Sequence, residues 1–269
     1  MGTKQKIYDN TGSLSVISCS YPGSAHVNMQ LPNQDHSAYQ VKDGRLFLAV
    51  SDGLGSCRYA NIGSKWAADQ ITKKMMKHFE AGSSSGERDF KPVFVRCMTE
   101  IRDELEKAAQ MSQVEPENSN ISKKDFAATL LFALTDESNL FCAQIGDGGI
   151  YLVCESEVQQ LFEPAKGEFS NITVPITHDQ WKDYLSIKLL ELPEDALFLC
   201  LMTDGFSDYI VQPESFFQRI AAEIRQRTVN EFEQWLDDLN EFYESKGFSD
   251  DDKTMSLIFF RELFKKQVK

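Results

Sequence analysis

The sequence of 269 residues predicts an α+β fold, because strands and helices occur in separate runs along the chain. A few strand-like segments come first and two long helical segments follow. Then come many strand-like segments, two further helices and one last strand. A doubly wound parallel sheet would instead alternate strand and helix. The last strand has no neighbour in sequence to pair with, so it must return to an earlier sheet, and we predict one domain over residues 1–269.

The spacing of apolar residues places each element in turn. Strands are expected at residues 14–19, 38–41, 46–50, 128–134, 140–145, 150–154, 158–162, 186–192, 197–202 and 255–260. Helices are expected after Ala60 and over residues 89–111, 213–227 and 228–245. The polar segments 81–88 and 112–124 are expected to be loops rather than domain linkers.

Three of these helices carry an apolar stripe that should face a sheet. In the first helix the stripe consists of Ile62, Trp66, Ile71, Met75 and Phe79. In the second it consists of Phe94, Met98, Ile101, Leu105 and Ala108, and in the last of Phe232, Trp235, Leu236, Leu239 and Phe242.

The composition limits the class of protein. A formal net charge of −13 repels nucleic acid and anionic membranes at long range, so neither is expected as a partner. Six dispersed cysteines without a C-x-x-C pair favour reduced core residues over a zinc site or disulfides. The start lacks an apolar signal segment, and the longest apolar run, 196–202, is too short to span a bilayer. We therefore expect a cytoplasmic protein.

Two apolar segments end on an Asp-Gly pair, in "LFLAVSDGLGS" (46–56) and "LFLCLMTDGFSD" (197–208). Asp-Gly is common in hairpin turns, but neither copy is followed at once by a second alternating strand. After the first copy come a polar loop and a helix. Asp52 is therefore expected at the C-terminal end of a strand, where side chains can converge on a cleft.

Four groups of carboxylates fall at comparable places. Asp35 precedes a strand, Asp52 and Asp204 end strands, and the triplet 250–252 leads into the last one. Each alone could be a solvated turn residue. At one sheet edge, however, they would repel one another unless a cation lay among them, and carboxylates suit hard divalent ions. Two such ions about 3.5 to 4 Å apart would activate a water and hold a phosphoryl oxygen.

Six motifs occur in order: "NQD" with Asp35, "AVSDGLGS", "AATLLFAL", "QIGDGGIYL", "LMTDGFSD" and "DDKTMSLIF". Together they resemble the successive motifs of the PPM or PP2C metal-dependent serine/threonine phosphatases. The similarity is closest to the short bacterial PP2C-like branch. Its pattern matches "GSAH" (23–26) with "PNQD" (32–35), "GDGG" (146–149), "GEFSNIT" (167–173) and "DDKT" (251–254). The resemblance covers nearly the whole chain.

This resemblance implies a four-layer α-β-β-α sandwich of two antiparallel sheets flanked by helix pairs. It also implies a cleft that holds two ions of Mn²⁺ or Mg²⁺. Asp52 would bridge both ions, and the backbone carbonyl of Gly53 would bind one of them. Asp35, Asp204 and Asp251 match the remaining ligand positions.

Four further positions follow from the same resemblance. Asp125 falls where bacterial relatives place a ligand for a weaker third metal, although a turn or cap role is the alternative. Asp147 is expected to brace a turn. Glu168 and Asn171 match a segment near the cleft, with no assigned chemistry.

The chain also departs from the family pattern. No arginine lies between Met1 and Asp35, where eukaryotic relatives place a phosphate-binding arginine, and Leu54 replaces the histidine of their "DGHGG" motif. His26 is therefore predicted to contact the substrate phosphate or the leaving alkoxide. The alternative is a histidine whose hydrogen bonds are satisfied by local backbone.

The predicted activity is hydrolysis of phosphoserine and phosphothreonine monoesters on proteins by a monomer. A metal-activated water would attack in line, without a phosphoenzyme. One alternative is a catalytically silent PP2C-like module that binds phosphoproteins or partners. A haloacid dehalogenase type of phosphatase, suggested by the D-x-D-x-T spacing of Asp250, Asp252 and Thr254, is disfavoured because a strand follows the motif.

Overall fold

The computed structural model describes residues 7–11, 14–80, 90–112, 121–136, 138–163 and 173–264. It contains one six-stranded and one five-stranded antiparallel sheet together with helices, which confirms the predicted α+β class. The chain divides into two compact units. The six-stranded unit comprises residues 1–33, 148–163 and 191–269, and the five-stranded unit comprises residues 34–147 and 164–190. The single domain expected from the sequence stays a prediction.

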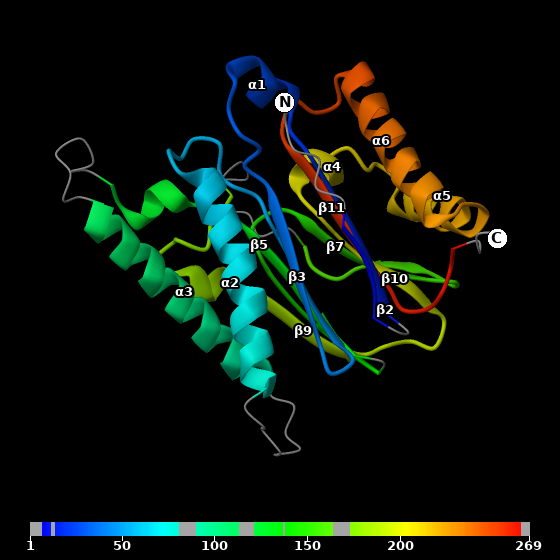
Figure 1. Cartoon of the computed structure of the whole chain (residues 1–269), viewed down its shortest axis with the longest axis horizontal. Helices are drawn as coiled ribbons and strands as arrows, with labels where there is room; N and C mark the ends of the chain where they lie inside the picture. The colour runs from blue at the N-terminus through cyan, green and yellow to red at the C-terminus, as the bar shows by residue number, and fades with distance from the viewer. Residues whose placement is uncertain are drawn as a thin grey trace. The chain divides into compact units, whose positions relative to one another are not determined.

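The six-stranded sheet has the order β1-β2-β11-β10-β7-β8. The last strand, β11, pairs antiparallel with β2 on one side and with β10 on the other, as Figure 1 shows. The predicted return of the final strand to an earlier sheet is thus confirmed. The strands are β1 (Ile7–Thr11), β2 (Leu14–Tyr21), β7 (Gly149–Cys154), β8 (Val158–Gln160), β10 (Ala196–Met202) and β11 (Lys253–Phe259).

Helices α5 (Pro213–Gln226) and α6 (Val229–Lys246) pack their apolar faces onto this sheet. Proline in the first turn of α5 suits a helix start, because that N–H has no partner inside the helix. Helix α6 begins with a capping box between Thr228 and Glu231 and ends at Gly247, which adopts a φ of 62°. These signals set the helix ends within one residue of the predicted ones.

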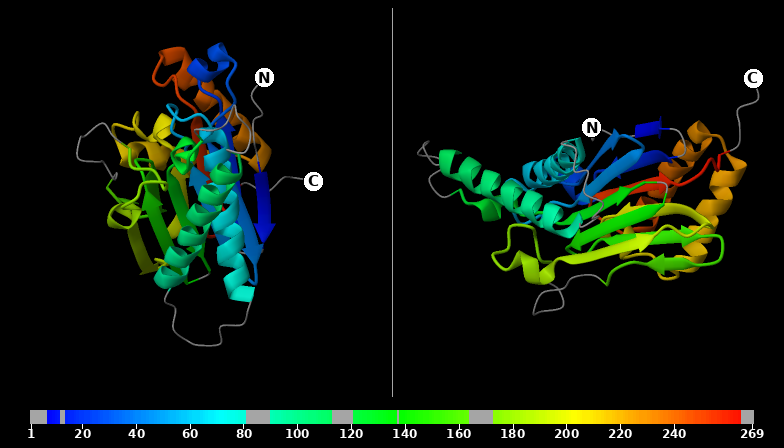
Figure 2. Two further views of the ribbon diagram at one scale, coloured as in Figure 1. Left: turned by 90° about the vertical axis from the view of Figure 1, so that its left-hand side faces the viewer. Right: turned by 90° about the horizontal axis from the view of Figure 1, so that it is seen from below.

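The five-stranded sheet has the order β3-β4-β5-β6-β9 and is covered by α2 (Ala60–Glu80) and α3 (Phe90–Ser112). The two helices run side by side, as Figure 2 shows. Aromatic rings of Phe94, Phe132 and Phe141 meet between α3 and the sheet. The strands are β3 (His36–Lys42), β4 (Arg45–Ser51), β5 (Leu130–Thr135), β6 (Asn139–Ile145) and β9 (Ser186–Glu191).

The predicted stripe of α2 is wrong at its N-terminal end. Ile62 and Trp66 are 48% and 36% exposed, whereas Gly63 and Ala67 face inwards. A Cβ on Gly63 would lie 2.1 Å from the carbonyl oxygen of Phe126, so the helix approaches its neighbour too closely for a larger residue. Hydrophobicity alone cannot identify a face whose contact requires small side chains.

The stripes of α3 and α6 are each wrong at one position. Ala109 is buried in place of Ala108, and Tyr243 is buried in place of Phe242. In both cases the neighbouring residue continues the helical spacing almost as well, because 3.6 residues per turn leaves two adjacent candidates for one face.

Several short elements were not predicted from the sequence. They are β1, α1 (Ser24–Met29), α4 (Asp204–Ser207) and the 3₁₀ turns η2 (Lys123–Phe126) and η3 (Trp181–Tyr184). A segment this short contains too few residues to show a hydrophobic period.

Five of the six cysteines are buried, which confirms the predicted core position for those five, whereas Cys57 is only partly buried. Among the described helices, none combines the length and the apolar character of a membrane span.

A buried hydrogen bond ties β2 to α6. The Tyr21 hydroxyl donates to Asp237 Oδ1 at 2.9 Å. Burial first, and then the nearby Cys19 and Asp237, raise the pKa of Tyr21 far above its usual value, so the hydroxyl remains a neutral donor.

We expect Tyr21→Phe to lower the free energy of unfolding by about 1–2 kcal/mol, because a buried bond to a carboxylate is lost. Urea unfolding measures the change. Tyr209→Phe is the control, since the Tyr209 hydroxyl makes no hydrogen bond among the described residues, and it should stay within about 0.5 kcal/mol. Equal stability of wild type and Tyr21→Phe would contradict the assignment.

Candidate metal site

Asp52 directly follows β4, and its backbone is held from both sides by Thr129. The Asp52 N–H donates to Thr129 Oγ1 at 3.0 Å, and the Thr129 N–H donates to the Asp52 carbonyl at 2.8 Å. The Ser51 hydroxyl in turn donates to the Thr129 carbonyl at 2.6 Å. These bonds connect the end of β4 to the start of β5, and they fix the main chain from which the Asp52 carboxylate projects.

Gly53 and Asp35 lie at the same end of the five-stranded sheet. His36 pairs with Ser51 across the β3–β4 ladder, so Asp35 and Asp52 are the next residues on neighbouring strands. The Gly53 N–H donates to the Gln34 carbonyl at 3.2 Å, which keeps this corner closed. A Cβ at Gly53 would lie 2.6 Å from a backbone oxygen, so only glycine fits there. Three of the predicted ligands are therefore neighbours.

Asp147, in the turn after β6, lies close to Asp52. A carboxylate oxygen of Asp147 lies within 4.8 Å of a carboxylate oxygen of Asp52. Thr173 Oγ1 donates a hydrogen bond to Asp147, which is the bracing role predicted for this residue. Gly146 before it has a φ of 105°, and a Cβ there would meet Thr129 Cγ2 at 2.5 Å. Thr129 thus contacts both the Asp52 and the Asp147 segments.

In the six-stranded unit, Asp204 follows β10 and opens α4. Thr203 and Thr254 hold this point by two hydrogen bonds. The Thr203 N–H donates to the Thr254 carbonyl at 3.0 Å, and the Thr254 N–H donates to Thr203 Oγ1 at 2.9 Å. A Cβ on Gly205 would lie 2.0 Å from the Asp252 carbonyl oxygen. The Asp204 segment therefore packs against the 251–254 segment, as the "DGF" and "DDKT" motifs require.

The three consecutive aspartates before β11 have different surroundings. Asp250 is exposed and accepts a hydrogen bond from the Ser24 hydroxyl at 2.8 Å. Asp251 is exposed and accepts from the Asp252 N–H at 2.8 Å. Asp252 is buried, and its Oδ1 accepts from the Gly23 N–H at 2.7 Å. Asp250 and Asp251 are thus accessible carboxylates, whereas Asp252 is not.

His26, on α1, is buried beside this segment. Its Nδ1 lies 2.9 Å from Asp252 Oδ2. A ring nitrogen of His26, a carboxylate oxygen of Asp251 and one of Asp252 lie within 4.8 Å of one another. A carboxylate on one ring nitrogen fixes the orientation of an imidazole. The structure therefore brings His26 next to one predicted ligand, Asp251, and within ion-pair distance of Asp252, which the sequence did not indicate.

Asp125 is used locally as a cap. Its Oδ2 accepts from the Ser122 N–H at 2.7 Å and from the Ser122 hydroxyl at 3.0 Å, closing the turn η2. This is the alternative role considered for Asp125, and its role toward a third metal stays a prediction. Glu168 and Asn171 lie outside the described residues.

The sequence did not reveal the groups that hold the aspartates in place. Thr129 and Thr254 belong to the motifs "AATLLFAL" and "DDKT", but nothing in the sequence distinguishes them from ordinary strand threonines. Asp252 was noted only as part of a triplet. Its burial depends on the loop at Gly23, which lies far from it in sequence.

Comparisons with known proteins identify a family and a relative of this chain. The protein phosphatase 2C family model matches residues 22–240. A serine/threonine-protein phosphatase 3 of Escherichia coli is 25% identical over 266 residues, which cover 93% of this chain and all of that protein.

Solved structures share the fold. A bacterial serine phosphatase is similar with a TM-score of 0.66 and 17% identity, over 94% of this chain and 99% of the other. The Staphylococcus aureus phosphatase Stp1 has a TM-score of 0.60 at 17% identity, over 96% and 95%. RsbX, solved in complex with magnesium, has a TM-score of 0.56 at 15% identity, over 95% and 99%.

The two antiparallel sheets and their helices have the fold of the solved bacterial serine phosphatase. The chain belongs to the protein phosphatase 2C family and is a metal-dependent serine/threonine protein phosphatase.

Replacing Asp252 tests the link between α1 and the last strand. We expect Asp252→Asn to lower the free energy of unfolding by about 1–2 kcal/mol, because a buried charged acceptor of the Gly23 N–H is lost. Asp250→Asn is the matched control and should change stability by less than about 0.5 kcal/mol, since Asp250 is exposed. Urea unfolding of the two variants compares them, and equal effects would contradict the distinction.

Proposed function

We propose that this phosphatase hydrolyses phosphoserine and phosphothreonine monoesters at a site for two Mn²⁺ or Mg²⁺ ions. The observation that carries the proposal is the cluster of carboxylates in the five-stranded unit, where Asp35 and Asp52 flank the paired residues His36 and Ser51 and an Asp147 oxygen lies within 4.8 Å of one of Asp52. Two like charges at this separation are unfavourable unless a cation lies near them. The proposed ligands are Asp35, Asp52, the Gly53 carbonyl, Asp204 and Asp251.

The chemistry of these donors fits the proposed metals. All of them are oxygen atoms, which Mg²⁺ and Mn²⁺ prefer over softer ligands. Two ions bound there would lower the pKa of a water toward neutrality and neutralise charge on the phosphoryl oxygens. The solved magnesium complex of RsbX supports Mg²⁺ as one of the two candidates.

Threonine residues of the chain hold the proposed metal ligands in position. Thr129 holds the Asp52 backbone, and the pair Thr203 and Thr254 holds the Asp204 backbone. Ligands that are already held in place lose little conformational entropy when the metal binds. We assign Asp147 to bracing, through its bond from Thr173, and Asp125 to a weaker third metal next to its capping role.

We also propose that His26 contacts the substrate phosphate or the leaving oxygen. Asp252 occupies the Nδ1 side of the ring, which leaves Nε2 for a phosphoryl oxygen. The closeness of His26 to Asp251 supports this role. His26 would thereby take over phosphate binding, since the sequence has no arginine before Asp35.

The partner that follows from the family is a phosphorylated protein. We propose that the enzyme acts as a cytoplasmic monomer, and that neither nucleic acid nor a membrane is a partner. The formal net charge of −13 supports these assignments, because it opposes binding to anionic polymers and surfaces.

Asp204→Asn tests the metal site. We expect the rate of Mn²⁺-dependent phosphate release from a phosphopeptide to fall by roughly 10²-fold or more, because one anionic ligand is lost. Isothermal titration with Mn²⁺ should show weaker binding. Asp208→Asn is the control, because Asp208 is exposed and lies one helical turn after Asp204. The phosphatase activity of this variant should match that of wild type. Turnover absent in wild type with Mn²⁺ bound would instead favour the catalytically silent module.

His26→Ala separates a substrate contact from a purely structural role. We expect KM to rise and kcat to fall by about tenfold, while the affinity for Mn²⁺ is retained. Steady-state kinetics with a phosphopeptide and titration with Mn²⁺ give the two readouts. If both kcat and KM are unaltered, His26 does not contact the substrate.

A further inference from the structure

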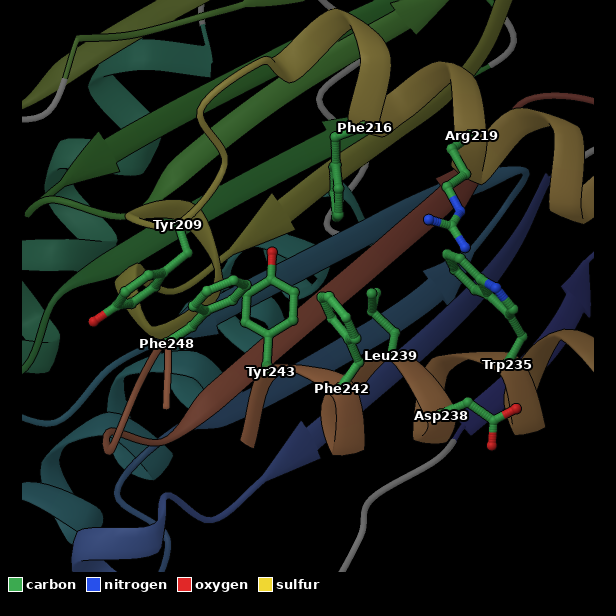
Figure 3. Close-up of a pocket in the computed structure, with 9 residues that line it drawn as sticks. All are labelled: Tyr209, Phe216, Arg219, Trp235, Asp238, Leu239, Phe242, Tyr243 and Phe248. Carbon is green, nitrogen blue, oxygen red and sulfur yellow. The ribbon is translucent and has the colours of Figure 1, made fainter. Parts of the chain in front are cut away.

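A groove lined by aromatic residues lies between α5 and α6, in the six-stranded unit (Figure 3). It has a volume of about 350 Å³. Phe242, Tyr209 and Phe248 are 48%, 42% and 38% exposed, and the Phe248 ring lies beside both other rings, so the three form a contiguous apolar patch rather than scattered surface residues. Phe216 from α5 and Trp235 and Leu239 from α6 complete the apolar lining.

The lining has the spacing of a helix-binding surface. Trp235, Leu239 and Phe242 follow one another at i, i+4 and i+7 along α6 and form one stripe. A stripe of this kind receives the apolar anchors of a second helix, which recur with the same spacing. Figure 3 shows Phe216 reaching toward this stripe from the opposite side, so that the groove has two walls.

Two acids lie on the α6 side of the groove. Asp238 lines it, and exposed Glu241 directly precedes Phe242. Neither carboxylate forms an ion pair with any of the described residues. Two bases are also near: Arg219 lines the groove with its Nε 3.9 Å from Glu223 on its own helix, and Lys246 Nζ lies 5.7 Å from the centroid of the Phe242 ring. The two acids without an ion pair among the described residues favour a partner that carries lysine or arginine beside its apolar residues.

We propose that this groove binds a basic amphipathic helix of a partner protein. A second copy of the chain fits less well, because two molecules that each carry a formal charge of −13 repel each other. The bound helix would also lie near the metal-ligand segments of the same unit. Tyr209 comes five residues after Asp204, and Phe248 comes three residues before Asp251. The Tyr209 and Phe248 rings stack with centroids 5.9 Å apart.

The test measures binding of a labelled peptide to the full chain by fluorescence anisotropy. The probe is a helical peptide of about 18 residues with leucine on one face and lysine on the other. We expect Phe242→Ala and the double variant Asp238→Lys/Glu241→Lys each to weaken binding by about tenfold. A peptide of the same composition, shuffled so that it has no apolar face, should bind about tenfold more weakly than the probe.

A matched control separates local from overall charge. Asp103→Lys/Glu194→Lys changes two exposed acids outside the groove and alters the net charge equally. The affinity of this control variant for the labelled peptide should equal that of wild type. Phe242 is half exposed, so an unchanged melting temperature is expected for Phe242→Ala; should that variant not fold, the charge variant carries the test.

Three results would overturn the proposal. The first is equal affinity of wild type, Phe242→Ala and the Asp238/Glu241 variant. The second is the same loss in both double variants, since binding would then depend on overall charge alone. The third is a wild-type dimer in sedimentation velocity that Phe242→Ala converts to a monomer, because the groove would then be an interface between copies. None of these readouts uses phosphatase activity, so they are independent of the proposed metal site.

Discussion

The repulsion between carboxylates at the ends of strands is the constraint on which the site depends. Carboxylate oxygens of Asp52 and Asp147 lie within 4.8 Å of each other, and like charges at that separation repel each other. The fold holds them there through backbone hydrogen bonds to Thr129 and a side-chain bond from Thr173. An arrangement that is costly for the protein alone becomes favourable when it binds a divalent cation.

The same construction occurs in each unit. In the five-stranded unit, Thr129 fixes the strand end that carries Asp52, and in the six-stranded unit, Thr203 and Thr254 fix the one that carries Asp204. In both places a glycine follows the aspartate and lies so close to another backbone segment that a Cβ would clash. This explains why each apolar strand ends on Asp-Gly without forming a hairpin: the glycine permits close packing rather than a two-residue turn.

Much of this could be predicted from the sequence, because strand and helix periods are local. The core strands, the four long helices and the return of β11 to an earlier sheet follow from apolar spacing and chain order. The inward face of α2 could not be predicted, because it uses Gly63 and Ala67 where the pattern favoured Ile62 and Trp66.

The positions of the proposed ligands were apparent as motifs, but the groups around them were not. Whether Asp250, Asp251 or Asp252 is buried depends on contacts with Gly23 and Ser24, more than two hundred residues earlier. Similarly, the partner of His26 depends on how the loop around α1 packs. Contacts between distant segments leave no periodic signal in either segment.

The central claim is that Asp52 and the other proposed ligands bind divalent cations. Thermal unfolding with added Mn²⁺ tests this claim most directly. A cation that binds only the folded chain raises the melting temperature as its concentration increases. We predict such a rise for wild type and little or none for Asp52→Asn. A melting temperature that is independent of Mn²⁺ in wild type, or that rises equally in Asp52→Asn, would contradict the account.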